Sequence, residues 1–89
     1  MKDGSIHRNT HGNEQYSKLL GLRLQQLRLE SDLSQEKIAH STGISTYTYQ
    51  KFEKGESRPG TPMNPRLFTL MALARTFNTT VSDLLKLDD

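Results

Sequence analysis

The sequence predicts a small all-α fold of five helices, and three observations support that prediction. Apolar residues recur at intervals of three and four positions along most of the chain, which is the spacing of one helix face. Two short segments of this kind begin after a serine and end at a glycine, as helices with N-caps and left-handed C-caps do. Glycine and proline are concentrated between residues 55 and 65, so this segment separates two helical halves.

Length and composition indicate one soluble domain. The 89 residues, of which 33% are hydrophobic, suffice for a single core that several helices share. No cysteine is present, which excludes disulfides and cysteine-based zinc sites. No apolar run approaches the roughly 20 residues of a membrane span, so we expect a cytoplasmic protein without a membrane partner. The net charge of +2 is compatible with nucleic-acid binding but does not require it.

Residues 1–13 are expected to form a flexible tail, because they contain two glycines and no helical period. His7 and His11 have the i,i+4 spacing that can hold a metal ion on a helix. Gly12 and the lack of a helical pattern beside them favour a solvated tail instead. We therefore expect neither a metal site nor a cofactor.

The first helix is expected to run from Glu14 to Ser31. One apolar stripe along it contains Tyr16, Leu20, Leu24, Leu27 and Ser31. A second apolar line on another side of the helix contains Leu19, Leu22 and Leu29. This second line has three interpretations: contact with Ile6 of the tail, contact with a second subunit, or leucines scattered over the surface.

Two short helical patterns follow, each with a start and a stop signal. Ser34 and Ser45 are the expected N-caps, and Gly43 and Gly55 end the two patterns. The residues expected to face the core from these helices are Ile38, Ala39, Tyr49 and Phe52. Two short helices joined by a turn that contains glycine form the helix-turn-helix arrangement. The sequence therefore predicts this motif over residues 34–54.

The rest of the chain is expected to contain an irregular loop and two helices. Residues 55–65 hold two glycines and three prolines, and Asn64 and Pro65 are expected to cap and start the fourth helix. The apolar face of that helix contains Leu67, Leu70, Leu73, Ala74 and Phe77. Thr80 is expected to cap the fifth helix, with Asp83 as its capping-box partner. The residues expected to face inward from this last helix are Val81, Leu84 and Leu85.

Two stretches carry a resemblance to a known family: GLRLQQLRLESDLSQEKIAHSTGISTYTYQKFEKG and PRLFTLMALARTFNTTVSDLL. They resemble the phage repressor and Cro family of helix-turn-helix regulators, of the xenobiotic-response-element type, from about Leu20 to Leu85. Family-typical positions of the motif are occupied by Gln35, Ala39, Gly43, Ile44, Tyr49 and Phe52. The resemblance implies a five-helix lambda-repressor-like DNA-binding domain over residues 14–89, of bacterial, phage or mobile-element origin.

The resemblance also implies which residues bind double-stranded DNA. Gln35 would bond a phosphate at the start of its helix. The recognition helix, residues 46–54, would present to the DNA the side chains of Ser45, Thr46, Tyr47, Thr48, Gln50 and Lys51. Gln50 could make a bidentate contact to adenine, and Lys51 could donate to guanine. The alternative for each of these residues is an ordinary solvated helix face.

Two further implications concern residues beside the recognition helix. The family places a basic residue of the following loop on the phosphate backbone, which makes Lys54, Ser57 and Arg58 candidates. The loop is longer here than is usual in the family, so the position of Arg58 stays open. Arg28 and Glu53 match a family ion pair between the first and third helices, which would orient the recognition helix without touching DNA.

The sequence leaves two functions open. A transcriptional regulator, expected to be a repressor, would bind a palindromic operator as a homodimer, because one recognition helix covers only a few base pairs. Its dimer interface is expected at the fifth helix and its end, formed by Val81, Leu84, Leu85 and Leu87. The alternative is an antitoxin or bridging cofactor that binds a protein partner with the same fold. An enzyme is not expected, since the chain contains no recognisable catalytic motif.

Overall fold

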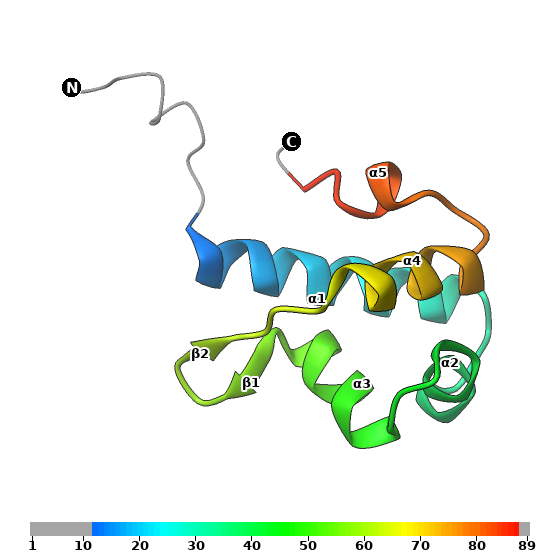
Figure 1. Ribbon diagram of the computed structural model, residues 1–89, viewed down its shortest axis with the longest axis horizontal. Helices are drawn as coiled ribbons and strands as arrows, with labels where there is room; N and C mark the ends of the chain where they lie inside the picture. The colour runs from blue at the N-terminus through cyan, green and yellow to red at the C-terminus, as the bar shows by residue number, and fades with distance from the viewer. Residues whose placement is uncertain (1–11, 88–89) are drawn as a thin grey trace.

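A computed structural model describes residues 12–87, which form five helices and one two-stranded sheet (Figure 1). The helices are α1 (Asn13–Glu30), α2 (Gln35–Thr42), α3 (Thr46–Lys54), α4 (Leu67–Thr76) and α5 (Val81–Leu84). The strands are β1 (Glu56–Arg58) and β2 (Thr61–Pro62). His7 and His11, whose spacing was of interest in the sequence, lie outside the described residues. None of the helices in residues 12–87 is long and apolar enough to cross a membrane.

The long helix α1 is the centre of the fold (Figure 1). In that view α2, α3 and the two strands lie on one side of α1, and α5 lies on the other. Leu20 and Leu24 of the predicted stripe are buried, Leu27 packs against the core, and Ser31 lies beyond the end of the helix. Leu22 and Leu29 of the second line are exposed, so this side of α1 contributes little to the core of a single chain.

The helix-turn-helix begins and ends where the sequence predicts. The hydroxyl of Ser34 accepts a hydrogen bond from the backbone N–H of Lys37 at 3.1 Å, and Ser45 caps α3 in the same way. Gly43 and Gly55 have φ angles of 77° and 82°, a conformation that glycine adopts without the steric penalty of a Cβ atom. The core residues that the motif contributes are Ile38, Ala39, Tyr49 and Phe52, all buried as predicted.

The segment after α3 is a β-hairpin, and the prediction of an irregular loop and a strictly all-α fold is therefore wrong. β1 and β2 pair antiparallel, with Glu56 opposite Pro62 and Arg58 opposite Thr61. Gly60 has a φ of 81°, which allows the chain to reverse between the strands. Pro62 of β2 is compatible with pairing because both strands are sheet edges, where a missing N–H leaves no central ladder position unfilled.

The start of α4 also differs from the prediction. The N-cap is Arg66 and the first helical residue is Leu67, whereas Asn64 and Pro65 belong to the preceding linker. That linker is held against α1, because the hydroxyl of Ser17 donates a hydrogen bond to the carbonyl of Met63 at 2.6 Å. Leu73 and Ala74 are buried as expected, and the residues Leu70 and Phe77 pack against the core, but Leu67 is exposed.

The last helix is a single turn. The Thr80 hydroxyl accepts a hydrogen bond from the backbone N–H of Asp83 at 3.0 Å, which confirms the predicted cap. Leu84 is buried and Val81 packs against the core, as expected. Leu85 is 41% exposed, so the prediction that it faces inward is wrong. The short helix has ended by then, and Leu85 is its C-cap residue.

Candidate nucleic-acid interface

The helix α3 has an inner and an outer side of different chemistry. Tyr49 and Phe52 point inward and are buried, with their rings 6.4 Å apart in an edge-to-face arrangement. The predicted readout residues Tyr47 and Gln50 are exposed, and Lys51 is half-buried beside them. Because Tyr49 and Phe52 fill the core, the outer side is left to Tyr47 and to polar and basic groups that can meet a ligand.

The predicted contacts at the start of α3 are partly used within the protein. The Ser45 hydroxyl accepts from the backbone N–H of Thr48 at 3.0 Å and donates to the Thr48 hydroxyl at 2.9 Å. These two hydroxyls therefore stabilise the helix start. Thr46, the first residue of α3, is half-buried. The groups of α3 with the most freedom to reach a ligand are those of its outer side.

A close crossing of α1 and α3 orients the outer side. The two helices meet at Gly21, where a Cβ atom would lie 2.5 Å from the backbone oxygen of Glu53 and 2.7 Å from that of Phe52. Only glycine allows this approach, since both opposing atoms belong to the backbone and cannot rotate away. This role of Gly21 was not predicted from the sequence, although a glycine inside a helical pattern, which costs helix stability, was a signal for it.

An ion pair beside the crossing confirms the predicted link between Arg28 and Glu53. The Arg28 guanidinium donates to both oxygens of the Glu53 carboxylate, at 2.6 and 3.2 Å, and to the carbonyl of Leu33 at 3.3 Å. Only 15% of the Arg28 side chain and 6% of the Glu53 side chain are exposed. A bidentate pair with so little exposure fixes the relative rotation of the two helices.

Gln35 connects this ion pair to the outer side of α3. Its amide nitrogen donates to a Glu53 oxygen at 3.0 Å, and its amide oxygen accepts from the Gln50 side chain at 3.2 Å. The chain Arg28, Glu53, Gln35, Gln50 thus runs from the inside of the molecule to a predicted readout residue. The resemblance predicted a phosphate contact for Gln35, and nothing in the sequence indicated that it would also hold Gln50.

The surroundings of the ion pair change the pKa values of its members. Burial favours the neutral form of Glu53, but hydrogen bonds from Arg28 and Gln35 outweigh it, and the pKa of Glu53 is lowered. The hydrogen bond to Glu53 raises the pKa of the Arg28 guanidinium. Burial raises the pKa of the Tyr49 hydroxyl, which lies close to the pair and has no hydrogen-bond partner within residues 12–87.

On the outer side, Lys51 lies over the ring of Tyr47. The Lys51 ammonium is 4.2 Å from the centre of the ring, which is the geometry of a cation–π interaction. The Tyr47 side chain is 67% exposed, so this contact forms on the surface rather than in the core. The ring holds the lysine in one region of the helix surface, from which it can still reach a ligand.

A hollow separates the outer side of α3 from the β-hairpin. It is lined by Tyr47, Gln50, Lys51, Lys54, Glu56, Ser57, Arg58 and Pro59, and we call it the cationic hollow. The structure brings together here six of the predicted DNA-binding residues, from both α3 and the hairpin. The position of Arg58 was open from the sequence because of the longer loop. In the structure the hairpin places Arg58 beside α3.

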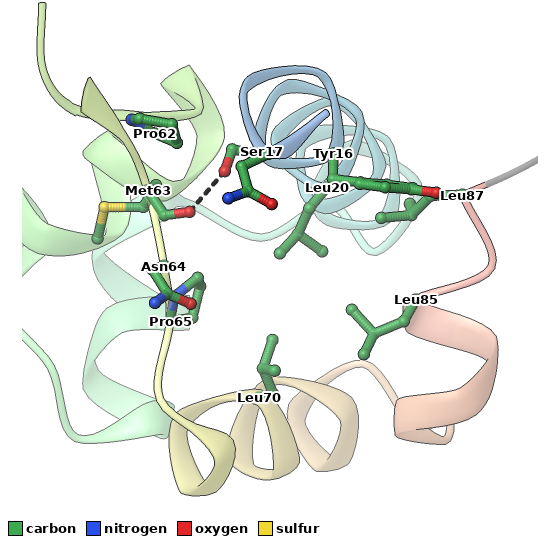
Figure 2. A pocket seen from close by; sticks show the side chains of 11 residues that line it. Tyr16, Ser17, Leu20, Pro62, Met63, Asn64, Pro65, Leu70, Leu85 and Leu87 are labelled. Atoms are coloured by element: carbon green, nitrogen blue, oxygen red, sulfur yellow. Dashed lines mark hydrogen bonds between the residues drawn. The ribbon is translucent and has the colours of Figure 1, made fainter. Parts of the chain in front are cut away.

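A second hollow, which lies beside α1, is mainly apolar (Figure 2). This apolar cavity has a volume of about 530 Å³ and lies between α1, the linker after β2, the start of α4 and the segment after α5. Its apolar lining includes Leu20, Met63, Leu70, Leu85 and Leu87. Leu85 and Leu87, two residues of the predicted dimer interface, thus face the cavity from its open rim.

The predicted dimer residues differ in what they can offer to a second chain. Leu84 is only 1% exposed and belongs to the core of the single chain, so it has no surface for a partner. Leu85 is 41% exposed, while Val81 and Leu87 are half-buried.

Among residues 12–87, no group of three His, Cys, Asp or Glu side chains could hold a metal ion.

Comparisons with known proteins support the interpretation of this surface. Residues 23–89 match the sequence profile of the Cro/C1-type HTH DNA-binding domain. The cryptic phage CTXphi transcriptional repressor RstR of Vibrio cholerae is 32% identical over 62 residues, which cover 70% of this chain and 50% of RstR. The chain therefore matches only about half the length of that relative.

A solved structure has the same fold. The clp gene regulator ClgR from Corynebacterium glutamicum superposes with a TM-score of 0.68 over 79% of this chain and 68% of that chain. The sequence identity is 17%, so this likeness concerns the fold alone.

Proposed function

The chain belongs to the Cro/C1-type HTH DNA-binding domain family, and we propose that it is a transcriptional repressor that reads its operator with α3. In this proposal α3 lies in the major groove, and two copies of the chain bind the two halves of a palindromic site. The repressor role is favoured by the likeness to RstR, which is named a transcriptional repressor.

One observation carries the proposal: the two sides of α3 are chemically separated. On the inner side, Tyr49 and Phe52 are buried in the core and Glu53 forms the ion pair with Arg28. The outer side carries Gln50 and Lys51, whose side chains can donate to base edges in the major groove. A helix held rigidly on one side and polar on the other is suited to reading DNA, because its readout groups keep a fixed register.

Gln35 supports both positioning and binding in this proposal. It lies at the start of α2, where the free backbone N–H groups and the positive end of the helix dipole favour a phosphate. Its hydrogen bond to Gln50 holds that side chain at the outer side of α3. A phosphate contact at Gln35 would therefore also affect the position of Gln50, which is proposed to read a base.

A homodimer is proposed because one short recognition helix contacts too few base pairs for specificity. Of the predicted interface, Val81, Leu85 and Leu87 keep some exposed surface, and Leu84 does not. Leu85→Ser should then weaken dimers measured by analytical ultracentrifugation. Phe68→Ser serves as the comparison, since Phe68 of α4 is 78% exposed and lies outside the predicted interface.

Protein interaction is a second candidate function, and the start of α4 favours it. Leu67, Phe68 and Met71 are all exposed there, which leaves apolar side chains without cover in the single chain. If Phe68→Ser, rather than Leu85→Ser, abolished self-association, α4 would be the interface and the predicted one would be wrong. If neither changed a measured dimer, both surfaces would be excluded.

Selection of bound sequences from random DNA tests the main proposal directly. A symmetric consensus with two half-sites about one helical turn apart is the expected result. Binding of all sequences with equal affinity, with only a steep dependence on salt, would contradict specific readout. A consensus with a single half-site would keep the α3 readout and overturn the dimeric arrangement.

A further inference from the structure

The β-hairpin is attached firmly enough to act as a functional element. At its end, the linker after β2 is held by the hydrogen bond of 2.6 Å from Ser17 to Met63. At its beginning, Gly55 lies so close to α1 that a Cβ atom would be 2.9 Å from the Cα atom of Lys18. Both ends are thus anchored on α1, the helix that also contacts α3 at Gly21. The hairpin and α3 therefore keep a fixed relative position.

The cationic hollow between these two elements carries positive charge on both walls. Lys51 and Lys54 line it from α3, and Arg58 lines it from the hairpin. Among the described residues that line it, Glu56 is the single acid. The carboxylate of Glu56 lies 3.6 Å from the ammonium of Lys18, a residue outside the hollow, so its charge is partly compensated elsewhere. Such a concavity attracts an anionic chain.

We propose that the hairpin is a second DNA-binding element, which places Arg58 in the minor groove next to the major-groove site of α3. The proposal rests on the proposed function, because it takes α3 as the element in the major groove. A sugar-phosphate strand then passes through the cationic hollow. This strand is neutralised from one side by Lys51 and Lys54 and from the other side by the hairpin.

The geometry of duplex DNA decides which groove the hairpin meets. Each backbone strand is the boundary between the major and the minor groove. If α3 lies in the major groove and the strand lies in the hollow, the opposite wall of the hollow is on the minor-groove side. Arg58 is exposed, and the chain reverses immediately after it at Pro59 and Gly60. The hairpin is therefore narrow at the end that carries Arg58.

The chemistry of Arg58 determines which sequences this contact favours. A narrow minor groove has an enhanced negative potential, and A·T-rich DNA has such a groove. The exocyclic amino group of guanine also projects into the minor groove, where it obstructs an inserted side chain. The hairpin should therefore favour A·T pairs beside the half-site that α3 reads, without contacting the major-groove edges of these pairs.

Binding assays with modified base pairs test this inference. The probe is a duplex with the half-site selected by the wild-type protein, in which three flanking pairs on each side in turn are A·T, G·C or I·C. An I·C pair resembles G·C in the major groove and A·T in the minor groove, because inosine lacks the 2-amino group. We expect A·T and I·C flanks on one side to bind equally, and G·C flanks to bind about tenfold more weakly.

The variant Arg58→Ala should bind all three flanks with the same, reduced affinity while it keeps the preference for the half-site. Arg75→Ala is the matched control, because it removes the same charge from an exposed residue of α4 and should keep the wild-type order of flanks. Thermal unfolding should be the same for both variants and the wild type, since both side chains are exposed.

Three outcomes would overturn the inference. The first is that the wild type binds I·C and G·C flanks equally and both more weakly than A·T flanks, which would show major-groove readout. The second is a flank preference that persists in Arg58→Ala. The third is equal weakening of all flanks by Arg58→Ala when the wild type has no preference, which indicates a phosphate contact only. In each case an intact half-site preference leaves the proposed function standing, whereas loss of that preference in the wild type contradicts the proposed function itself.

Discussion

The two regions that border α3 are built in opposite ways. At the crossing with α1 there is no free space: Gly21 lies against the backbone of α3, and Arg28 and Glu53 form a nearly buried bidentate pair. At the cationic hollow the side chains of Lys51, Lys54 and Arg58 line an open space instead of packing into the core. The first region fixes the position of the helix, and the second leaves its polar groups available.

This difference separates stability from binding along a single helix of nine residues. Changes at the crossing should lower the free energy of unfolding and affect DNA binding only through the fold. Changes at the hollow should affect DNA binding and leave the free energy of unfolding nearly constant. The following predictions test that separation, in order of decreasing effect.

Glu53→Gln should have the largest effect on stability. It keeps the shape of the side chain but leaves the Arg28 guanidinium, 15% exposed, without its counter-charge. Loss of one partner of a pair with so little exposure costs about 3 kcal/mol, measured as the free energy of unfolding in urea. Glu56→Gln is the control, because its pair with Lys18 at 3.6 Å is much more exposed, with 58% of the Lys18 and 27% of the Glu56 side chain accessible, and should contribute less than about 1 kcal/mol. Equal effects of the two substitutions would contradict the importance of burial at the crossing.

The same pair predicts a dependence of stability on pH. The pKa of Glu53 is lowered in the folded protein from its ordinary value of 4.5, so folding favours the ionised carboxylate. Its contribution is complete above pH 4.5 and is lost as the pH falls through the lowered pKa. The difference in unfolding free energy between the wild type and Glu53→Gln should therefore shrink below pH 4.5. A constant difference down to pH 3 would show that the charge of Glu53 is not responsible.

Gly21→Ala should come next, because its new methyl group would meet the backbone oxygen of Glu53. We expect a loss of about 2 kcal/mol in unfolding free energy, since the two helices must move apart. Gly12→Ala is the matched control, since no atom of the described residues lies within 4 Å of its added Cβ and its backbone is extended. In an ordinary exposed helix position Gly→Ala is stabilising, so a stabilised Gly21→Ala variant would contradict the close crossing.

Lys51→Ala belongs to the open region and should change binding rather than stability. If Lys51 reads a base, the variant loses about 1–3 kcal/mol of binding free energy on the selected operator and relaxes the preference at one base position. Lys54→Ala is the comparison: a phosphate contact there would weaken binding to all sequences alike and reduce the dependence on salt. If Lys51→Ala instead lowered the affinity for every sequence equally, Lys51 would contact the DNA phosphate backbone and not a base.

The smallest effect is expected at Tyr47. Tyr47→Leu removes the ring under the Lys51 ammonium, which stabilises that position by about 0.5 kcal/mol at an exposed site. Operator affinity should fall about twofold, which fluorescence anisotropy can resolve. Tyr47→Phe keeps the ring and should bind as the wild type does. A large loss in Tyr47→Phe would instead show that the hydroxyl contacts DNA.

The helix-turn-helix could be predicted in detail because its signals are local. Ser34, Gly43, Ser45 and Gly55 lie within a few residues of the helix ends that they define, and each acts where the sequence predicts. The inward direction of Tyr49 and Phe52 follows from their spacing on one helix face. The ion pair of Arg28 and Glu53 was found only because the chain resembles a family, since the two residues are far apart in sequence.

The segment from Gly55 to Pro65 shows where local signals fail. Its glycines and prolines predict turns, and a reversal is present at Gly60. They also led to the prediction of an irregular loop, whereas the structure has two short strands there. Strands of two or three residues bury too little to leave a periodic pattern, and their pairing depends on the attachment of the segment to α1. The exposure of Leu67 and Leu85 was missed for a related reason, since periodicity indicates which side of a helix is apolar but not where the core ends.

The local features of this protein could be derived from the residues alone: the helix caps, the turn of the motif, and the side of each helix that is apolar. These depend on backbone conformation and on spacings of a few residues, which one stretch of chain contains in full. Three features required the packed molecule: the contact of Gly21 with α3, the link from Glu53 through Gln35 to Gln50, and the hairpin that completes the cationic hollow. Each of these joins segments distant along the chain, and their partners are defined only once the helices have packed.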